Sequence, residues 1–277
     1  MRRLKRILLV IAILVGVAVA YRVLGVYEFR SGECTALRPR KFTSTYPKRL
    51  VVMTFNIEGH AALLRSDHIE EVAKTIRKYN PDIVAINEAH RGTWQARFGD
   101  HVEKLRRLTG MNGVFGRSYT FLGGEFGNAV LTRGDVLKAD VHKLPGTGEP
   151  RSLLEAVVRV NGGVVEIYVT HTTAWGPINK ITRDTQLQCI NAHLQASGFP
   201  FIVAGDLNAP PESEEIARFL NRNVLQISGD LKTPTHRVTE QRLDYILADP
   251  GWTIRSAQVL DDGPSDHRPV IAELVHP

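Results

Sequence analysis

The chain has 277 residues, of which 43% are hydrophobic, and its central part shows no repeat or low-complexity tract, so it can bury the core of one large domain. The formal net charge is +6, but residues 1–50 hold 11 Lys and Arg against 2 Asp and Glu, which leaves 24 against 27, or −3, for residues 51–277. The basic charge therefore belongs to the N-terminal segment and gives no support for a nucleic-acid-binding body.

The N-terminal segment predicts export. MRRLKR is followed by fifteen uncharged residues from Ile7 to Tyr21, and cations before an apolar run place the N-terminus in the cytoplasm and the rest across the membrane. Arg22 can snorkel and extend the run to the roughly 20 residues that a bilayer needs, whereas Ala18-Val19-Ala20 resembles a cleavage site. We expect residues 1–27 to be an uncleaved signal anchor. The chain would then be a single-pass protein of the cytoplasmic membrane with a periplasmic or extracellular body, or a secreted one if the segment is cleaved.

Residues 28–48 are basic, contain Pro39 and Pro47 and lack periodicity, so we interpret them as a linker before a domain over residues 49–277. Cys34 lies in this linker and Cys189 in a later amphipathic helix. In an exported protein the two can form one disulfide. A buried free Cys189 with an incidental Cys34 is an equally good interpretation.

The domain opens with a strand, a helix and a strand. LVVMTFNI is apolar on both faces, as in a covered core strand, and ends at Asn56, with Glu58 two residues further on. Asp67 can cap the helix that follows. DIVAINE forms the next core strand and ends at Glu88. Asn56 and Glu88 therefore lie at matching strand ends.

The middle of the chain predicts antiparallel pairing. The apolar segments 153–160 and 164–170 flank Asn161-Gly162-Gly163, a strong hairpin signal, and the second segment ends in His171. A helix over about residues 179–196 then returns the chain to another core strand.

That core strand lies in PFIVAGDLNAPP and ends at Asp206. Asn208, two residues on, points the same way in extended chain, although a local turn before the next helix would also explain the pair. Near the C-terminus, LDYILA places Asp244 beside a core strand, and SDHRPVIAEL places Asp266 and His267 directly before the last one.

Polar side chains thus lie next to six strands, at one end of each, which is hard to explain by independent caps or surface pairs. Four carboxylates with an amide are oxygen ligands suited to Mg²⁺ or Mn²⁺, and two histidines without a cysteine cluster argue against structural zinc. Crowding four acids without a cation would cost several kcal/mol. The residues therefore predict phosphate-ester hydrolysis with a hard cation.

Seven segments of the chain also resemble a known superfamily in their order and spacing: TFNIEG, DIVAINE, GNAVLTR, VTHTTAW, AGDLNAPP, RLDYIL and SDHRPV. They are similar to the endonuclease/exonuclease/phosphatase superfamily, the group of exonuclease III, pancreatic deoxyribonuclease, neutral sphingomyelinase and the inositol-polyphosphate phosphatases, over residues 49–274. The resemblance implies an α/β (α+β) fold, a four-layered sandwich of two mostly antiparallel sheets flanked by helices, here preceded by the membrane anchor. It is specific for the superfamily and not for the member.

The resemblance implies a metal site at one edge of this sandwich. Glu88 would be the principal ligand, helped by Asn56 and Asp266. Glu58 matches a position that is often a secondary ligand, although the residue type there varies. Mg²⁺ or Mn²⁺ would be the cofactor, and one or two ions remain open.

The resemblance also implies catalytic roles. Asp206 would orient or deprotonate the attacking water, and Asn208 would hold a phosphate oxygen. His267, oriented by Asp244, would donate to the phosphoryl group. His171 would do the same from the other side or assist the leaving oxygen. Hydrolysis would be direct and in line, without a covalent enzyme intermediate.

The substrate is left open by the sequence. Asn128 and Arg183 recur in similar motifs and can position the phosphate or support the site, and Trp175 can stack a base, touch lipid or pack internally. We expect a monomeric metal-dependent phosphodiesterase or phosphatase that acts on a lipid head group, a nucleotide or nucleic acid. A nuclease acting on extracellular DNA or RNA, and a surface binding protein without activity, are the alternatives.

Overall fold

The computed structural model describes residues 10–13, 16, 34, 45–121, 123–146, 148–174, 179–223 and 225–277. Within these residues the chain forms two mixed six-stranded sheets. The first has the order β11-β12-β1-β2-β4-β3. Its strands are β1 (Arg49–Asn56), β2 (Ile83–Arg91), β3 (Asn112–Phe121), β4 (Gly124–Thr132), β11 (Thr253–Val259) and β12 (Val270–Val275).

The second sheet has the order β5-β6-β7-β8-β10-β9. Its strands are β5 (Asp135–Lys143), β6 (Ser152–Val160), β7 (Gly163–His171), β8 (Phe201–Asp206), β9 (Gln226–Ile227) and β10 (Asp244–Ala248). The helices are η1 (Gly59–Leu63), α2 (His68–Tyr79), α3 (His101–Thr109), α4 (Asn179–Gln195) and α5 (Glu214–Asn223).

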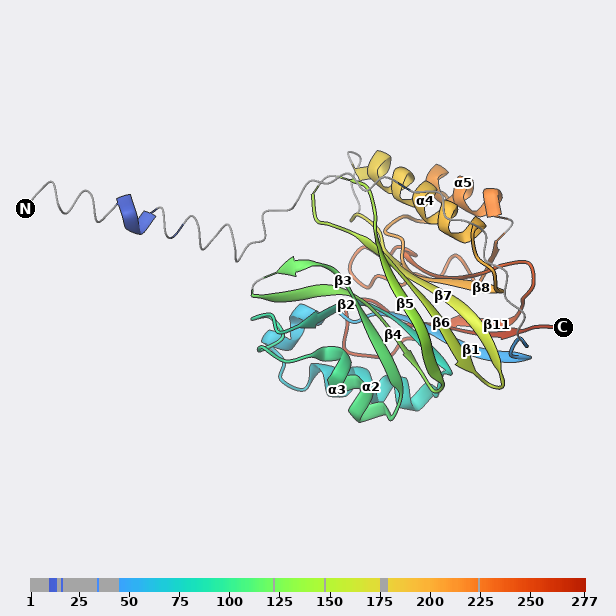
Figure 1. Cartoon of the computed structure of the whole chain (residues 1–277), viewed down its shortest axis with the longest axis horizontal. Coiled ribbons are helices and arrows are strands. Elements are labelled where there is room, and N and C mark those ends of the chain that lie inside the picture. Colours follow the sequence, from blue (N-terminus) through green and yellow to red (C-terminus); the bar gives the residue numbers. More distant parts are fainter. Residues whose placement is uncertain are drawn as a thin grey trace, which may run out of the picture.

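Three apolar layers hold the sandwich together. The inner faces of the two sheets meet in a core that includes Val52, Ala85, Leu154 and Ile246. Apolar residues of α2 and α3 cover the outer face of the first sheet, and those of α4 and α5 cover the outer face of the second. Figure 1 shows this order, with α2 and α3 on one side of the strands and α4 and α5 on the other. The predicted arrangement of two sheets flanked by helices is confirmed.

One parallel strand pair in each sheet brings the predicted polar ends together. β1 and β2 are parallel, with Asn56 beside Asn87, and β7 and β8 are parallel, with His171 beside Asp206. The other pairs are antiparallel. Because a parallel pair needs a crossover connection, the helical segments between its strands let both strands end at the same edge of the sheet.

Some local predictions differ from the structure. Asp67 precedes α2 but makes no side-chain cap hydrogen bond, because its backbone (φ −94°, ψ 2°) lacks the extended geometry typical of a capping residue. Cys34 and Cys189 form a disulfide with a Cα–Cα distance of 5.3 Å, which resolves the alternatives left open by the sequence.

Most of the expected anchor and linker, residues 1–27 and 28–48, lies outside the described residues. In the part of the chain that the structure describes, no helix combines the length and the apolar character that crossing a membrane requires. Trp175 also lies outside the described residues.

Candidate active site

The polar strand ends meet in an open pocket of about 470 Å³ at one edge of the sandwich. Among the predicted site residues, those that line it are Glu88, His171, Asp206, Asn208, Asp266 and His267. The other three contact this lining: Asn56 contacts Glu88, Asp244 contacts His267, and Glu58 contacts Asp266. The structure therefore brings together every residue that the sequence predicted for the site.

Asp206 lies at the centre of this arrangement, with its side chain 2% exposed. Its Oδ2 accepts a hydrogen bond from Asn56 Nδ2 at 3.2 Å and lies 3.4 Å from His171 Nε2 and 3.7 Å from His267 Nε2. Burial, and then the negative charge of Asp244, raises the pKa of the Asp206 carboxyl. A carboxylate held in this way is suited to accept a proton near neutral pH.

His267 and Asp244 form a buried pair. Asp244 Oδ2 lies 2.8 Å from His267 Nδ1, and antiparallel pairing of β10 with β8 places Asp244 directly opposite Asp206. Burial alone would lower the pKa of His267, but the Asp244 and Asp206 carboxylates raise it to about 10. His267 is therefore a cation at neutral pH, with its Nε2 directed at the pocket side of Asp206.

The pKa of His171 is displaced in the direction opposite to that of His267. Its side chain is 7% exposed, and burial, followed by the positive charge of Arg151, lowers its pKa well below the usual value. At neutral pH the His171 imidazole is therefore neutral. The two histidines that approach Asp206 thus differ in charge.

The acidic side of the pocket is more open. Glu88 and Glu58 have side chains 23% and 20% exposed, and the His60 ring lies between them, 3.8 Å from Glu88 Oε2 and 3.7 Å from Glu58 Oε1. The Asp266 backbone N–H donates to Glu58 Oε2 at 3.1 Å. Burial would raise the pKa of Glu88, but the interaction with His60 and the hydrogen bond from Asn56 hold it well below its usual range.

These side chains fit a divalent cation. Glu88 and Asp266 line the pocket, Glu58 accepts the Asp266 backbone N–H beside it, and carboxylate oxygens are the ligands that hard cations such as Mg²⁺ prefer. Asn56 donates from Nδ2 to Glu88 at 3.1 Å, and its Oδ1 accepts the Glu58 N–H at 3.2 Å. Asn56 therefore positions the two glutamates, and ligation through its oxygen stays a prediction.

The backbone is held in uncommon conformations at this edge. Glu58, Glu88 and Asn208 have φ values of 48°, 61° and 49°, in the left-handed region that side-chain-bearing residues seldom adopt. Gly205 has a φ of 140°, and a Cβ there would lie 2.0 Å from the Thr170 carbonyl oxygen. The glycine before Asp206 is therefore required for β8 to pass close to β7.

Asn87 is a site residue that the sequence analysis missed. Its side chain is fully buried, its Oδ1 accepts the Asp206 N–H at 2.9 Å, and its Nδ2 donates to Asn128 Oδ1 and to the Thr170 carbonyl. The sequence feature that could have revealed Asn87 is the presence of an asparagine inside the apolar run DIVAINE. Asn128 therefore acts on the site through Asn87.

Asn208 and Arg183 brace the segment after His171. Asn208 Nδ2 donates to the Thr172 carbonyl at 3.1 Å, and the Asn208 N–H donates to Asp206 Oδ1 at 2.8 Å. Arg183, on α4, donates to the Ala174 carbonyl and forms a buried ion pair with Glu215. Arg183 lies outside the pocket lining, so its role is to support the loop.

Arg151 is the second residue that the sequence did not reveal. It lines the pocket, is 7% exposed, and pairs with Glu149 through Nη2 at 3.1 Å. Its Nε and Nη1 are buried without a hydrogen-bond partner among the described residues. A buried guanidinium with free donors is suited to bind a phosphate oxygen.

Comparisons with known proteins agree with this geometry. A model of the Endonuclease/Exonuclease/phosphatase family matches residues 53–267. Comparison with curated protein sequences gives no match. Among solved structures, an endonuclease/exonuclease/phosphatase from Beutenbergia cavernae is 25% identical, with a TM-score of 0.71 over 83% of this chain and 72% of that chain.

Two further solved structures share the fold at 18% identity. The mannosyl-6-phosphatase of Bacteroides thetaiotaomicron VPI-5482 has a TM-score of 0.67 over 82% of this chain and 99% of that chain. D. rerio TDP2, complexed with single-strand DNA product, has a TM-score of 0.66 over 82% of this chain and 98% of that chain.

Proposed function

Because the chain belongs to the endonuclease/exonuclease/phosphatase family, whose members hydrolyse phosphate esters, we propose that it is a Mg²⁺- or Mn²⁺-dependent phosphoesterase. It hydrolyses its substrate by direct in-line attack of water and acts as a monomer. The observation that carries this proposal is the position of Asp206. Its Oδ2 is buried and lies within 3.7 Å of both a neutral and a cationic histidine, His171 and His267.

In this proposal Asp206 accepts the proton of the attacking water, since its raised pKa makes it a stronger base than an exposed aspartate. His267 donates a hydrogen bond from Nε2 to the phosphoryl oxygens as their negative charge grows, and Asp244 holds the ring in orientation through Nδ1. His171 contacts the phosphoryl or leaving oxygen from the other side. Asn208 contributes by fixing the Asp206 carboxylate and a phosphate oxygen.

Glu88, Glu58 and Asp266 would hold the divalent cation, with Asn56 fixing the two glutamates. The bound ion would neutralise charge on the phosphate and polarise it as a Lewis acid. Members of the family generally use divalent metals, and the oxygen-rich donor set supports Mg²⁺ or Mn²⁺ over softer ions.

We favour a compact phosphate ester, such as a phosphorylated head group or nucleotide, over a polynucleotide. The folded part carries a net charge of about −3 (24 cations against 27 anions in residues 51–277), whereas nucleic-acid binding depends strongly on basic surface. Arg151 lines the pocket, and the tilted aromatic pair Tyr119 and Phe126 lines the same space. Arg151 would contact the substrate phosphate, with the aromatic rings against the rest of the molecule.

The test is an assay of the purified full-length chain against a phosphomonoester, a phosphodiester chromogen, phospholipids, DNA and RNA, each with Mg²⁺, with Mn²⁺ and with chelator. Turnover of a small ester that stops with chelator supports the proposal. Turnover confined to DNA or RNA would favour the nuclease. Absence of turnover of every substrate with every metal would favour a binding protein that keeps the fold.

We also propose that the body acts outside the cytoplasmic membrane, anchored by residues 1–27, or secreted if that segment is cleaved. The supporting observations are the cationic MRRLKR before an apolar run, and the Cys34–Cys189 disulfide, a bond that persists mainly in oxidising compartments. Protease added to intact spheroplasts should digest an anchored body, and release into the medium would mark a secreted one. Retention with protection until lysis would overturn the orientation.

A further inference from the structure

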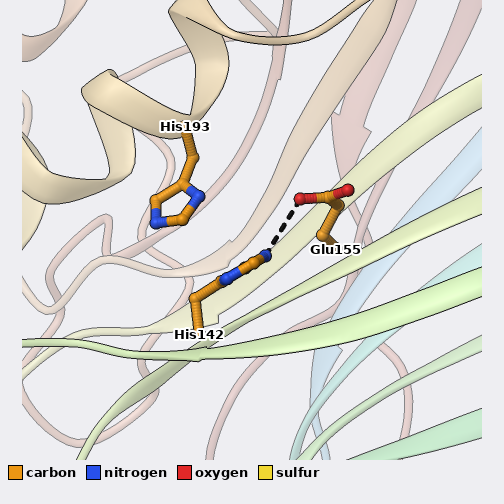
Figure 2. A group of neighbouring side chains, drawn as sticks. All are labelled: His142, Glu155 and His193. Atoms are coloured by element: carbon orange, nitrogen blue, oxygen red, sulfur yellow. Dashed lines mark hydrogen bonds and ion pairs between the residues drawn. The ribbon is translucent and has the colours of Figure 1, made fainter. Parts of the chain in front are cut away.

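A second polar cluster lies in the apolar layer between α4 and the second sheet. It consists of His142 on β5, Glu155 on β6 and His193 on α4, whose side chains point toward one another in Figure 2. One ligand atom from each lies within 4.8 Å of those from the other two. His142 Nε2 is 2.9 Å from Glu155 Oε2, and the two imidazole rings are 4.1 Å apart between centroids. No member of the cluster lies among the described residues that line the catalytic pocket.

Strand register builds this cluster. Leu153 pairs with His142 across β5 and β6, so Glu155, two residues on, lies diagonal to His142 on the same face. By the same rule Glu166 on β7 lies diagonal to Glu155. This face is otherwise covered by apolar residues of the layer under α4, including Leu153 and Tyr168. Packing alone gives no reason for polar groups at these positions.

The charges within the cluster favour a cation. Glu155 and Glu166 are both buried, and a cation beside Glu155 would lower the cost of burying two neighbouring carboxyl groups. The two imidazole rings lie 4.1 Å apart between centroids, and imidazole nitrogens are good metal ligands. His142 is 20% exposed, so an ion can reach the cluster from solvent.

We infer that His142, Glu155 and His193 form a metal site, separate from the catalytic pocket, that binds Zn²⁺ or a similar borderline cation. Two imidazoles with one carboxylate form a set that Zn²⁺ uses, with a further position open to water. Zn–N bonds of about 2.0–2.1 Å put tetrahedral ligand atoms about 3.4 Å apart, so small side-chain rotations close the site. Mg²⁺ prefers an all-oxygen set, which separates the two sites by chemistry.

The site would fix α4 to β5 and β6. His193 lies in the last turn of α4, and Cys189, one turn earlier, carries the disulfide. In the middle of the same helix, Gln186 Oε1 accepts the Thr173 N–H at 2.9 Å, in the segment that follows His171. A cation at the far end of α4 would therefore stabilise the helix that braces this segment.

The test measures zinc content rather than turnover. The full-length chain is stripped with chelator, equilibrated with excess Mg²⁺, dialysed against micromolar Zn²⁺ and analysed by elemental mass spectrometry. We expect one equivalent of zinc in the wild type and in Glu88→Gln, and a rise in Tm with zinc. His142→Ala and His193→Ala should each lose that equivalent, whereas the control His276→Ala, a half-buried histidine near the C-terminus, should retain it.

Cobalt gives an independent readout, because tetrahedral Co²⁺ with imidazole ligands absorbs visible light strongly. That absorption should appear in the wild type and be lost in His142→Ala, whose Mg²⁺-dependent turnover should equal that of the wild type. His142 is half-buried on β5, so this variant tests the site even if His193→Ala fails to fold. Absence of zinc from the wild type, or retention of the equivalent in His142→Ala, would overturn the inference.

Discussion

Glu88, inside β2, and Asp206, at the end of β8, belong to different sheets, meet in one pocket, and have pKa values displaced in opposite directions. Glu88 contacts His60 and accepts a hydrogen bond from Asn56, and these contacts hold its pKa below the usual range. Asp206 is more deeply buried and faces Asp244, so its pKa is raised. Two carboxylates of similar chemistry are thereby prepared for different tasks, one to stay ionised beside a cation and one to exchange a proton.

The difference comes from the sheets that carry them. A bulge between Ile86 and Ala89 turns Glu88 toward the more open side of the pocket, whereas regular pairing of β8 with β10 sets Asp206 against a second carboxylate. The positively charged neighbour of Asp206 is His267. It lies in the segment directly before β12, which is a strand of the first sheet. Asp206 therefore has its negative neighbour, Asp244, in its own sheet and its positive neighbour, His267, in a segment next to the first sheet.

The largest expected effect tests this division directly. Asp206→Asn should lower kcat by at least about 10²-fold at saturating metal, because it removes the proton acceptor. Glu88→Gln should also reduce activity but recover part of it as the Mg²⁺ concentration is raised. The measurement is kcat as a function of Mg²⁺, with thermal melting as the folding control. Recovery of Asp206→Asn by metal would show that the two acids share one role.

A double-mutant cycle sharpens the Asp206 side of the comparison. Asp244→Asn and His267→Ala should each lower kcat, but the two together should cost far less than the sum of the singles, because Asp244 acts through His267. The cycle compares kcat for the wild type, the two single variants and the double variant. Additive losses would mean that Asp244 acts on Asp206 independently of His267.

Arg151 tests whether the pocket wall contributes to substrate binding. Arg151→Ala should raise KM for a phosphate ester by about 10-fold, as expected for loss of a charge-assisted hydrogen bond, with a smaller change in kcat. Arg117→Ala is the matched control, since Arg117 pairs with Glu125 on the exposed surface of the first sheet. Equal KM values for the two variants would remove Arg151 from the substrate site.

The smallest expected effect is a displacement of the pH profile. Turnover requires Asp206 deprotonated and His267 protonated, so kcat should rise as Asp206 loses its proton and fall as pH passes about 10. Asp244→Asn removes a negative charge, which lowers the pKa of both groups. Both the rise and the fall of kcat should therefore move to lower pH. A pH profile that does not move would contradict the assignment of these steps to Asp206 and His267.

The site was largely predictable because its residues follow strand ends. Asn56, His171 and Asp206 end β1, β7 and β8, and that position is visible without knowing how the strands pair. The strand end predicted at Glu88 is wrong, because β2 continues through a bulge between Ile86 and Ala89 to Arg91. Arg151 follows no such pattern. It precedes β6, and only the approach of β6 to the site places its guanidinium in the pocket.

Long-range neighbours explain what else the sequence did not reveal. The pairing of Cys34 with Cys189 remained one of two interpretations, since spacing along a chain does not give a distance in space. His142, Glu155 and His193 carry no shared motif, because their proximity depends on β5–β6 register and on how α4 lies across the sheet. Asp67 is the opposite case: the local sequence predicted a helix cap, but its side chain makes no capping hydrogen bond in the structure.

The two-sheet class was implied by the resemblance to a known superfamily. By itself, the sequence determined the order of the strands and helices and the acids, amides and histidines near their ends. These are properties of apolar periodicity and of local turns, which act over a few residues. Only the tertiary structure decided which acid stays ionised, which histidine is charged and which guanidinium reaches the pocket. Those properties depend on burial and on charges from distant segments, and both arise when the two sheets pack together.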